Sequence, residues 1–319
     1  GGGSSELGPY EVATYTQNDG MHSGSLYADA TIYHPIGYTD LLGSIILGAG
    51  FGGDQESMEN WAYYFSSYGF VSATIQYNDP VNDSHGFRAE AMLELINSIK
   101  MEDDRPNSPL YNALDTNEFA AVGYSLSGGS VQLAAVLNSS LSAVIALNPT
   151  IIVEDCELCA GSEYCICLVP EFLDHSVPTL IIAGQNEVNE LPDYDGLLGQ
   201  DQYYNTPETT TKLLYEIGGG GHSSTEWPGA SEGIPGRLAL NWLNYFIQNK
   251  EEYCDSVLVV PVNASQFLTT LDCEQGPPPP PLPQNVGYLR QTETSFCMDD
   301  CGNYFLESEN GEFLYNVAN

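Results

Sequence analysis

Basic side chains are scarce in this sequence. Lysine and arginine together number 7 among 319 residues, against 43 aspartates and glutamates, and the formal net charge is -36. Such a surface repels phosphate groups, so nucleic acid is excluded as a partner. The acidic residues are spread along the whole chain. That distribution fits a saline habitat, where salt screens self-repulsion, and it fits an acidic secreted protein equally well.

Long apolar runs are missing as well. No stretch reaches the roughly 18 residues that a membrane span needs, so no membrane partner is expected. We recognise neither a secretory signal nor a transit peptide, and we interpret residues 1–5 as a linker. Hydrophobic residues still make up 42% of the chain, which is enough to form the core of one large domain and a small one.

The eight cysteines are even in number and fall in local groups. Four disulfides in a secreted, extracellular protein are the simplest interpretation. One group has the spacing C-x2-C-x5-C-x-C and could instead bind zinc. That spacing is unusual for zinc, and the acids beside it are harder ligands, so we expect two disulfides there and no metal. The groups are Cys156, Cys159, Cys165 and Cys167; Cys254 and Cys273; and Cys297 and Cys301.

Strand-like and helix-like patterns alternate along residues 1–275. This alternation predicts an α/β fold with a mostly parallel twisted sheet and helices on both faces. The predicted strands are 10–16, 28–33, 43–47, 70–76, 119–122, 143–147, 179–183 and 212–217, and the predicted helices are 87–99, 130–137 and about 236–248.

A proline-rich segment divides the chain. Five consecutive prolines within 276–285 predict a stiff polyproline II linker between the domain 1–275 and a small β-rich module at 286–319. Apolar segments on either side of Asn310-Gly311 predict a β-hairpin in that module. Its core is too small to be stable without a Cys297–Cys301 disulfide or docking. It could anchor the protein to a surface, act as a sorting tag, or pack on the main domain.

The sequence G-Y-S-L-S-G-G at 123–129 follows an apolar strand pattern and precedes a helix pattern. A serine on a sharp strand-to-helix turn is how the α/β-hydrolase fold exposes a nucleophile, so we predict that fold with Ser125 as the nucleophile. The last glycine of G-x-S-x-G is replaced by Ser127. The alternative is an ordinary Gly/Ser-rich loop after a buried strand.

A serine nucleophile needs a histidine base, and in this fold the chain order is serine, acid, histidine. Only His175 and His222 follow Ser125. His222 comes after the strand 212–217, at the carboxyl end where ligands bind, and is the predicted base. His175 precedes the strand 179–183 and should lie away from the site. The three earlier histidines are expected to be surface or structural residues: His22, His34 and His85.

The acid should follow the strand 179–183, where Glu187 stands. Glu190 and Asp193 are the alternatives. The oxyanion needs two backbone N–H donors, which we predict at Leu126 and at Phe51 in the glycine-rich turn 48–53. The Phe51 ring would then line the cleft, whereas the alternative is an aromatic side chain packed beneath the loop.

With these residues identified, the chain resembles the bacterial polyester hydrolases, the PETase and actinobacterial cutinase group of the dienelactone-hydrolase-like α/β-hydrolases. The resemblance spans residues 8–273. It is carried by 8–10, 50–51, 69–71, 123–126, 177–181 and 216–223. It implies a disulfide between Cys254 and Cys273, the nucleophile, base and oxyanion roles given above, and Glu187 where the family has aspartate.

The resemblance also implies four substrate-binding residues, namely Phe51, Tyr124, Thr150 and Ser223. Tyr124 stands where PETase has tryptophan and cutinases have histidine, and Ser223 is similar to the small residue of PETase. Thr150 replaces a family tryptophan, so an aromatic clamp on the substrate is expected to be missing. An insertion at about 151–176 holds the clustered cysteines and is expected to form a disulfide-braced rim.

The expected activity is that of a secreted, monomeric serine carboxylic-ester hydrolase. Its expected substrates are polyesters such as poly(ethylene terephthalate) and small soluble esters, cleaved through an acyl-enzyme without a cofactor. A structural Ca²⁺ on the acidic surface is left open. One alternative is a small-ester carboxylesterase or lipase without polymer activity, and the other is a binding protein that kept the fold without catalysis.

Overall fold

The structure is a computed structural model that describes residues 6–152, 173–192, 194, 196–275, 287–291, 304–308 and 313–317. The chain divides into two compact units, Gly1–Pro279 and Pro280–Asn319, and each is described by itself. Several sequence predictions lie outside the described residues: most of the rim insertion, the proline-rich linker, Asp193, and the cysteines of the groups 156–167 and 297–301.

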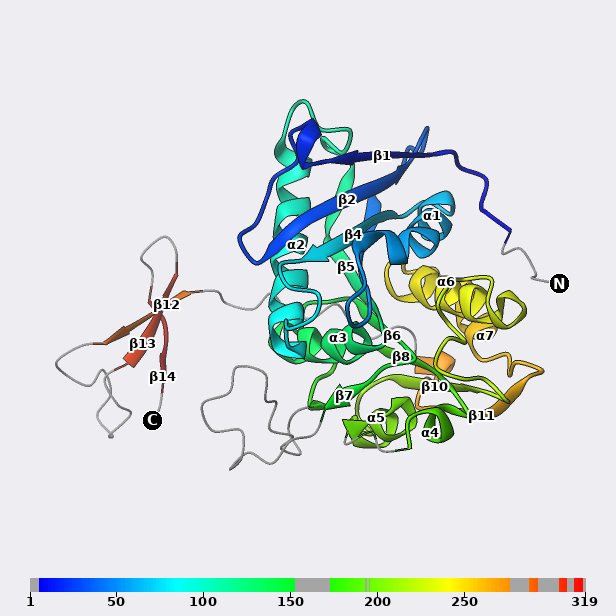
Figure 1. The fold of residues 1–319 in the computed structure, drawn as a ribbon. Helices are drawn as coiled ribbons and strands as arrows, with labels where there is room; N and C mark the ends of the chain where they lie inside the picture. The colour runs from blue at the N-terminus through cyan, green and yellow to red at the C-terminus, as the bar shows by residue number, and fades with distance from the viewer. Residues whose placement is uncertain are drawn as a thin grey trace. The chain divides into compact units, whose positions relative to one another are not determined.

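Nine of the strands described in the first unit form one sheet, in the order β1-β2-β4-β3-β5-β6-β8-β10-β11 (Figure 1). The six strands from β4 to β10 in that order run parallel, while β1, β2 and β11 pair antiparallel with their neighbours. The predicted, mostly parallel sheet is therefore confirmed. The strands are β1 Val12–Thr16, β2 Tyr27–Pro35, β3 Leu42–Gly48, β4 Val71–Tyr77, β5 Leu114–Tyr124, β6 Ala143–Leu147, β8 Thr179–Gly184, β10 Lys212–Ile217 and β11 Ala264–Thr269.

Helices cover both faces of this sheet (Figure 1). Side chains of α2, α3 and α5 pack in one hydrophobic cluster, and side chains of α1 and α6 pack in the other. Successive strand residues point to opposite faces, so Ile46 joins the first cluster while Ile45 and Leu47 join the second. The helices are α1 Glu59–Ser67, α2 His85–Asp104, α3 Leu126–Leu137, α4 Glu187–Glu190, α5 Gly199–Asn205, α6 Ile234–Phe246 and α7 Cys254–Val257.

The sequence patterns did not predict α1, α4, α5, α7, β11 or the short antiparallel pair β7 (Ile151–Ile152) and β9 (Gly196–Leu197). Aromatic residues are weak helix formers, and α1 is rich in them. It is held by burial instead, because Trp61 and Phe65 are fully enclosed and Tyr64 is nearly so. The bounds of β6 and β10 agree with the predicted ranges.

In the second unit, the described strands β12 Gly287–Gln291, β13 Tyr304–Ser308 and β14 Phe313–Val317 form an antiparallel sheet in that order. β13 and β14 pair with Leu306 opposite Tyr315, which is the strand pairing that the predicted hairpin requires. Among the described residues of the chain, no helix is long and apolar enough to cross a bilayer.

The Cys254–Cys273 disulfide is present, and it joins the start of α7 to the segment after β11. It encloses the antiparallel edge strand β11, which pairs with β10, the strand that precedes His222. A cross-link over 19 residues restricts the unfolded chain and so favours the folded state.

Replacing both cysteines, Cys254→Ala with Cys273→Ala, should lower the free energy of unfolding by about 3 kcal/mol because a closed loop of this length is released. Urea unfolding followed by tryptophan fluorescence measures the change. A double variant with the same unfolding free energy as the wild type would show that this cross-link does not stabilise the fold.

Candidate active site

Ser125 lies at a sharp turn between β5 and α3. Its backbone has φ 54 and ψ -116, a conformation that is costly for a residue with a side chain. The turn is tight enough that a Cβ on Gly123 would collide with the Ser127 carbonyl, and one on Gly128 would lie 2.7 Å from the Pro149 Cβ. The glycines of the motif therefore permit the turn, and the turn presents the Ser125 hydroxyl at the end of the sheet.

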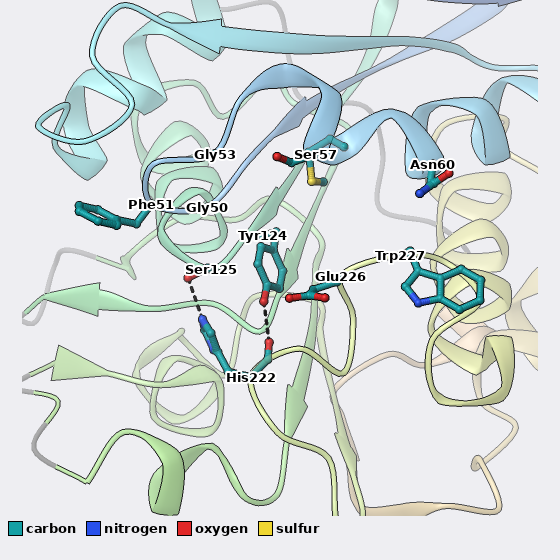
Figure 2. Close-up of a pocket in the computed structure, with 11 residues that line it drawn as sticks. Gly50, Phe51, Gly53, Ser57, Asn60, Tyr124, Ser125, His222, Glu226 and Trp227 are labelled. Carbon is teal, nitrogen blue, oxygen red and sulfur yellow. Dashed lines mark hydrogen bonds between the residues drawn. The ribbon is translucent and has the colours of Figure 1, made fainter. Parts of the chain in front are cut away.

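Three side chains meet there from distant parts of the chain. The Ser125 Oγ lies 2.9 Å from the His222 Nε2, and the His222 Nδ1 lies 2.6 Å from the Glu187 Oε1 (the serine contact is dashed in Figure 2). An ionised carboxylate can only accept hydrogen bonds, so Nδ1 carries the imidazole proton. The Nε2 is then free to accept the serine proton. This arrangement can activate Ser125 as a nucleophile.

Glu187 is fully buried at the start of α4. Its second oxygen, Oε2, accepts the Gly184 N–H at 2.7 Å. A buried charge is tolerated only where it is paired or hydrogen-bonded, and Glu187 has a partner on each oxygen. The structure thus brings together the three residues that the sequence proposed as a triad.

Three hydrogen bonds hold the loop after β10 that carries His222. The Tyr124 hydroxyl donates to the His222 carbonyl at 2.8 Å, and the His222 N–H donates to the Glu190 Oε2 at 2.7 Å. The Asn148 Nδ2 lies 3.3 Å from the Gly221 carbonyl. A Cβ on Gly221 would collide with the Glu190 carboxylate, so a larger residue there would displace that carboxylate from the His222 N–H. Glu190, an alternative acid in the sequence analysis, instead holds the backbone of the base.

Asn148 was not identified from the sequence. It follows β6 with φ 41, and its amide oxygen accepts the Thr225 hydroxyl. The only signal was a polar residue at the carboxyl end of a predicted strand. Tyr124 was predicted to contact substrate, but its hydrogen bond to His222 spans 98 residues and was not foreseen.

The predicted oxyanion loop packs directly on the nucleophile. A Cβ on Gly50 would lie 3.1 Å from the Ser125 Cβ, which places the Gly50–Phe51 peptide beside the serine. The Phe51 side chain is 66% exposed and lines the cavity, so it is not an aromatic residue packed beneath the loop. Among the described residues, we find no hydrogen-bond partner for the N–H of Phe51 or of Leu126. Both amides therefore remain able to bind an oxyanion.

A buried arginine supports this loop from beneath. The Arg88 Nη1 donates to the carbonyls of Ala49 at 2.9 Å and Gly50 at 3.3 Å, and Nη2 donates to the Pro80 carbonyl at 2.6 Å. Carbonyl and N–H point in opposite directions across a trans peptide. The bond from Arg88 to the Gly50 carbonyl therefore directs the Phe51 N–H away from the arginine.

Ser127, the departure from the usual motif, belongs to the same network. Its hydroxyl bonds the Ala49 carbonyl, lies 2.8 Å from the Tyr77 hydroxyl and accepts from the Arg88 Nη1 at 3.2 Å. The arginine also stacks over the Tyr77 ring, 4.3 Å from its centroid. One feature of the sequence hints at this role, since a rare basic residue, Arg88, lies within the apolar pattern of a predicted helix.

Two further histidines are buried and structural, as expected. Burial lowers the pKa of His85 to about 4, and its Nε2 lies 2.7 Å from the Thr150 carbonyl. Burial likewise lowers the pKa of His175 to about 4, and its Nε2 lies 2.8 Å from the Gln132 Oε1. Both are neutral at pH 7, and His175 bonds to α3 instead of Ser125.

A cavity of about 600 Å³ opens over Ser125 and His222 (Figure 2). Of the predicted substrate-binding residues, Phe51 and Tyr124 line it. Thr150 is buried and Ser223 is exposed, and neither is part of the cavity wall. The remaining wall includes Met58, Asn60, Glu226 and Trp227, which the sequence analysis did not identify.

Most of the first unit is similar to known proteins. A family model described as PET hydrolase-like matches residues 4–272. A bis(hydroxyethyl) terephthalate hydrolase of Streptomyces coelicolor is 25% identical over 255 residues, which cover 77% of this chain and 70% of that protein. Cutinase 1 of Thermobifida cellulosilytica is 25% identical over 252 residues, covering 77% and 83% respectively. A cutinase of Thermobifida fusca is also 25% identical, covering 77% and 72%.

Glu187→Gln should slow the reaction of Ser125 with a fluorophosphonate probe on the order of 10³- to 10⁴-fold, because the amide can hold His222 in the wrong tautomer. The second-order labelling rate measures the effect. Glu274→Gln, an exposed acid near the end of the first unit, should label at the wild-type rate. Equal rates for Glu187→Gln and the wild type would remove Glu187 from the proposed triad.

Arg88→Gln should slow the same labelling reaction roughly 10- to 100-fold, because the reaction forms an oxyanion that a misplaced Phe51 N–H stabilises poorly. Arg105→Gln is the matched control, since Arg105 bonds Glu102 at the opposite end of α2. Both variants should lose thermal stability, but only Arg88→Gln should lose labelling rate. If the two variants label equally fast, Arg88 has a structural role alone.

Proposed function

The chain belongs to the PET hydrolase-like family, and from that premise we propose that it is a secreted serine hydrolase that cleaves carboxylic esters. We propose as its substrates polyesters such as poly(ethylene terephthalate) and small soluble esters. The observation that carries the proposal is the continuous hydrogen-bonded chain from the Ser125 hydroxyl through His222 to the buried Glu187. The names of the relatives, a terephthalate-ester hydrolase and two cutinases, favour esters of this kind.

In the proposed reaction, His222 takes the proton of Ser125 as the serine oxygen attacks the ester carbonyl. The N–H groups of Leu126 and Phe51 stabilise the resulting oxyanion. His222 then passes the proton to the leaving alcohol, and an acyl-enzyme remains. Water, deprotonated by His222, releases the acid and restores the serine. These steps use protein groups and water, so we propose no cofactor.

The shape of the site supports an extended substrate. The Phe51 ring stands exposed at the wall of the cavity, where it offers an aromatic face to an acyl group. Tyr124 forms part of the same wall beside His222, with the two rings 5.6 Å apart. A polymer segment must lie across the surface with only one ester at the serine, and an open, partly aromatic cavity allows this.

One observation favours the alternative of a small-ester carboxylesterase or lipase. Thr150 is buried, and its main chain is engaged by the Ser125 carbonyl and by His85. No aromatic clamp stands at that position, so contact with a terephthalate ring relies more on Phe51.

The Cys254–Cys273 disulfide supports the proposed secretion, because such bonds persist in oxidising compartments. We also propose that the enzyme acts as a monomer.

Soluble acid released from an amorphous poly(ethylene terephthalate) film, measured beside turnover of 4-nitrophenyl butyrate, tests the proposal. The wild type should act on both substrates, and Ser125→Ala should lose at least about 10³-fold on each. Turnover of the butyrate without release from the film would favour the small-ester alternative. Activity on neither substrate would leave a binding protein as the better interpretation.

A further inference from the structure

We propose that Glu226 makes this active site select its substrates by charge, so that it favours neutral esters over esters whose acyl part carries a carboxylate. The inference rests on the proposed ester hydrolysis and concerns the same cavity. It assigns a specificity role to a residue outside the triad and the oxyanion hole.

Glu226 belongs to the wall of the cavity that contains Ser125 and His222. Figure 2 shows its carboxylate beside the hydroxyl end of Tyr124, on the same side of the cavity as Trp227. The residue is exposed, and within the described part of the chain no lysine, arginine or histidine forms an ion pair with it. A negative charge therefore faces the space that a substrate enters.

Two more carboxylates lie at the same end of the sheet, each bonded to His222. Glu187 is paired with His222, while Glu190 is exposed and bonded to the His222 N–H. Burial first, and then the charges of Glu226, Glu187 and Glu190, raise the pKa of Tyr124. The same three charges oppose another anion in this cavity by Coulomb repulsion.

Positive charge does not balance these acids at the cavity wall. The described lining contains no lysine and no arginine. Arg88 lies beneath the oxyanion loop, is fully buried, and directs its hydrogen bonds to carbonyls and to the Ser127 hydroxyl. Arg237 is exposed on α6 and bonds the Glu232 carbonyl. Along the described lining, an anionic substrate would find no lysine or arginine to bind its carboxylate.

A matched pair of substrates tests the proposal. Mono(4-nitrophenyl) adipate carries a free carboxylate at the end of its acyl chain, and methyl 4-nitrophenyl adipate has the same chain with a neutral end. The measurement is the ratio of kcat/KM for the neutral ester to kcat/KM for the anionic ester. It is made at low salt, after subtraction of spontaneous hydrolysis.

In the wild type the neutral ester should be preferred. Glu226→Gln should reduce the ratio about fivefold, the Coulomb effect of two charges about 7 Å apart at an effective dielectric constant of about 50. Glu226→Lys should reduce it further, because it adds attraction for the carboxylate. Sodium chloride at about 1 M should reduce the wild-type ratio more than the Glu226→Gln ratio, since salt screens exposed charges.

Glu252→Gln is the control, since Glu252 is an exposed acid outside the cavity and its loss changes the net charge equally. Its ratio should equal that of the wild type. An unchanged ratio in both Glu226 variants would overturn the proposal, and an equal shift in Glu252→Gln would assign the effect to the whole surface instead. If the wild type hydrolyses neither adipate, the proposed function itself fails, which is a different result from an unchanged ratio.

Discussion

The hydrogen bond between the buried Glu187 carboxylate and the His222 imidazole is the interaction on which the site depends. It fixes the proton on Nδ1 and so leaves Nε2 as the acceptor for Ser125. The sheet makes this contact possible, because β8 and β10 are parallel neighbours with Gly184 opposite Ile217. The segments that follow these two strands therefore begin side by side, and each brings one residue of the pair.

The order of residues along the chain was enough to predict this pair. The parallel α/β pattern implies that residues after neighbouring strands meet at one edge, so Ser125, Glu187 and His222 could be placed by element alone. The same logic could not find Arg88, Asn148 or the role of the Tyr124 hydroxyl. The bonds from these three side chains to Gly50, Gly221 and His222 join segments 38 to 98 residues apart through specific side-chain directions, which periodicity does not encode.

Some strands of the fold could be predicted from the sequence and others could not. Continuous apolar segments such as β6 and β10 are buried in the parallel sheet and have a clear sequence signal. β11 has none, because it is an edge strand with polar residues, and Ser265 and Gln266 both bond Glu216 on its neighbour. Its place in the sheet follows from tertiary pairing with β10 and not from its own composition.

The few basic residues also explain how the active site can be so acidic. Arg88 and Lys212 are fully buried, and Lys212 bonds the carbonyls of Tyr203 and Thr206. Arg105 is mostly buried against Glu102. The side chains of these three residues lie inside the protein, so few basic side chains remain to offset the acidic residues on the surface.

The position of Arg88 joins this charge pattern to catalysis. Arg88 is fully buried, and burial lowers its pKa because a cation is less stable where water is excluded. Carbonyls accept its hydrogen bonds, and the nearby carboxylates of Asp83 and Asp79 offset part of its charge. In the proposed reaction, the negative charge that develops at the ester oxygen meets the backbone N–H groups of Leu126 and Phe51, and Arg88 orients the second of these. A permanent anion farther out in the cavity faces Glu226 instead. The buried arginine thus positions an oxyanion donor, while the exposed glutamate at the cavity wall disfavours a charged substrate.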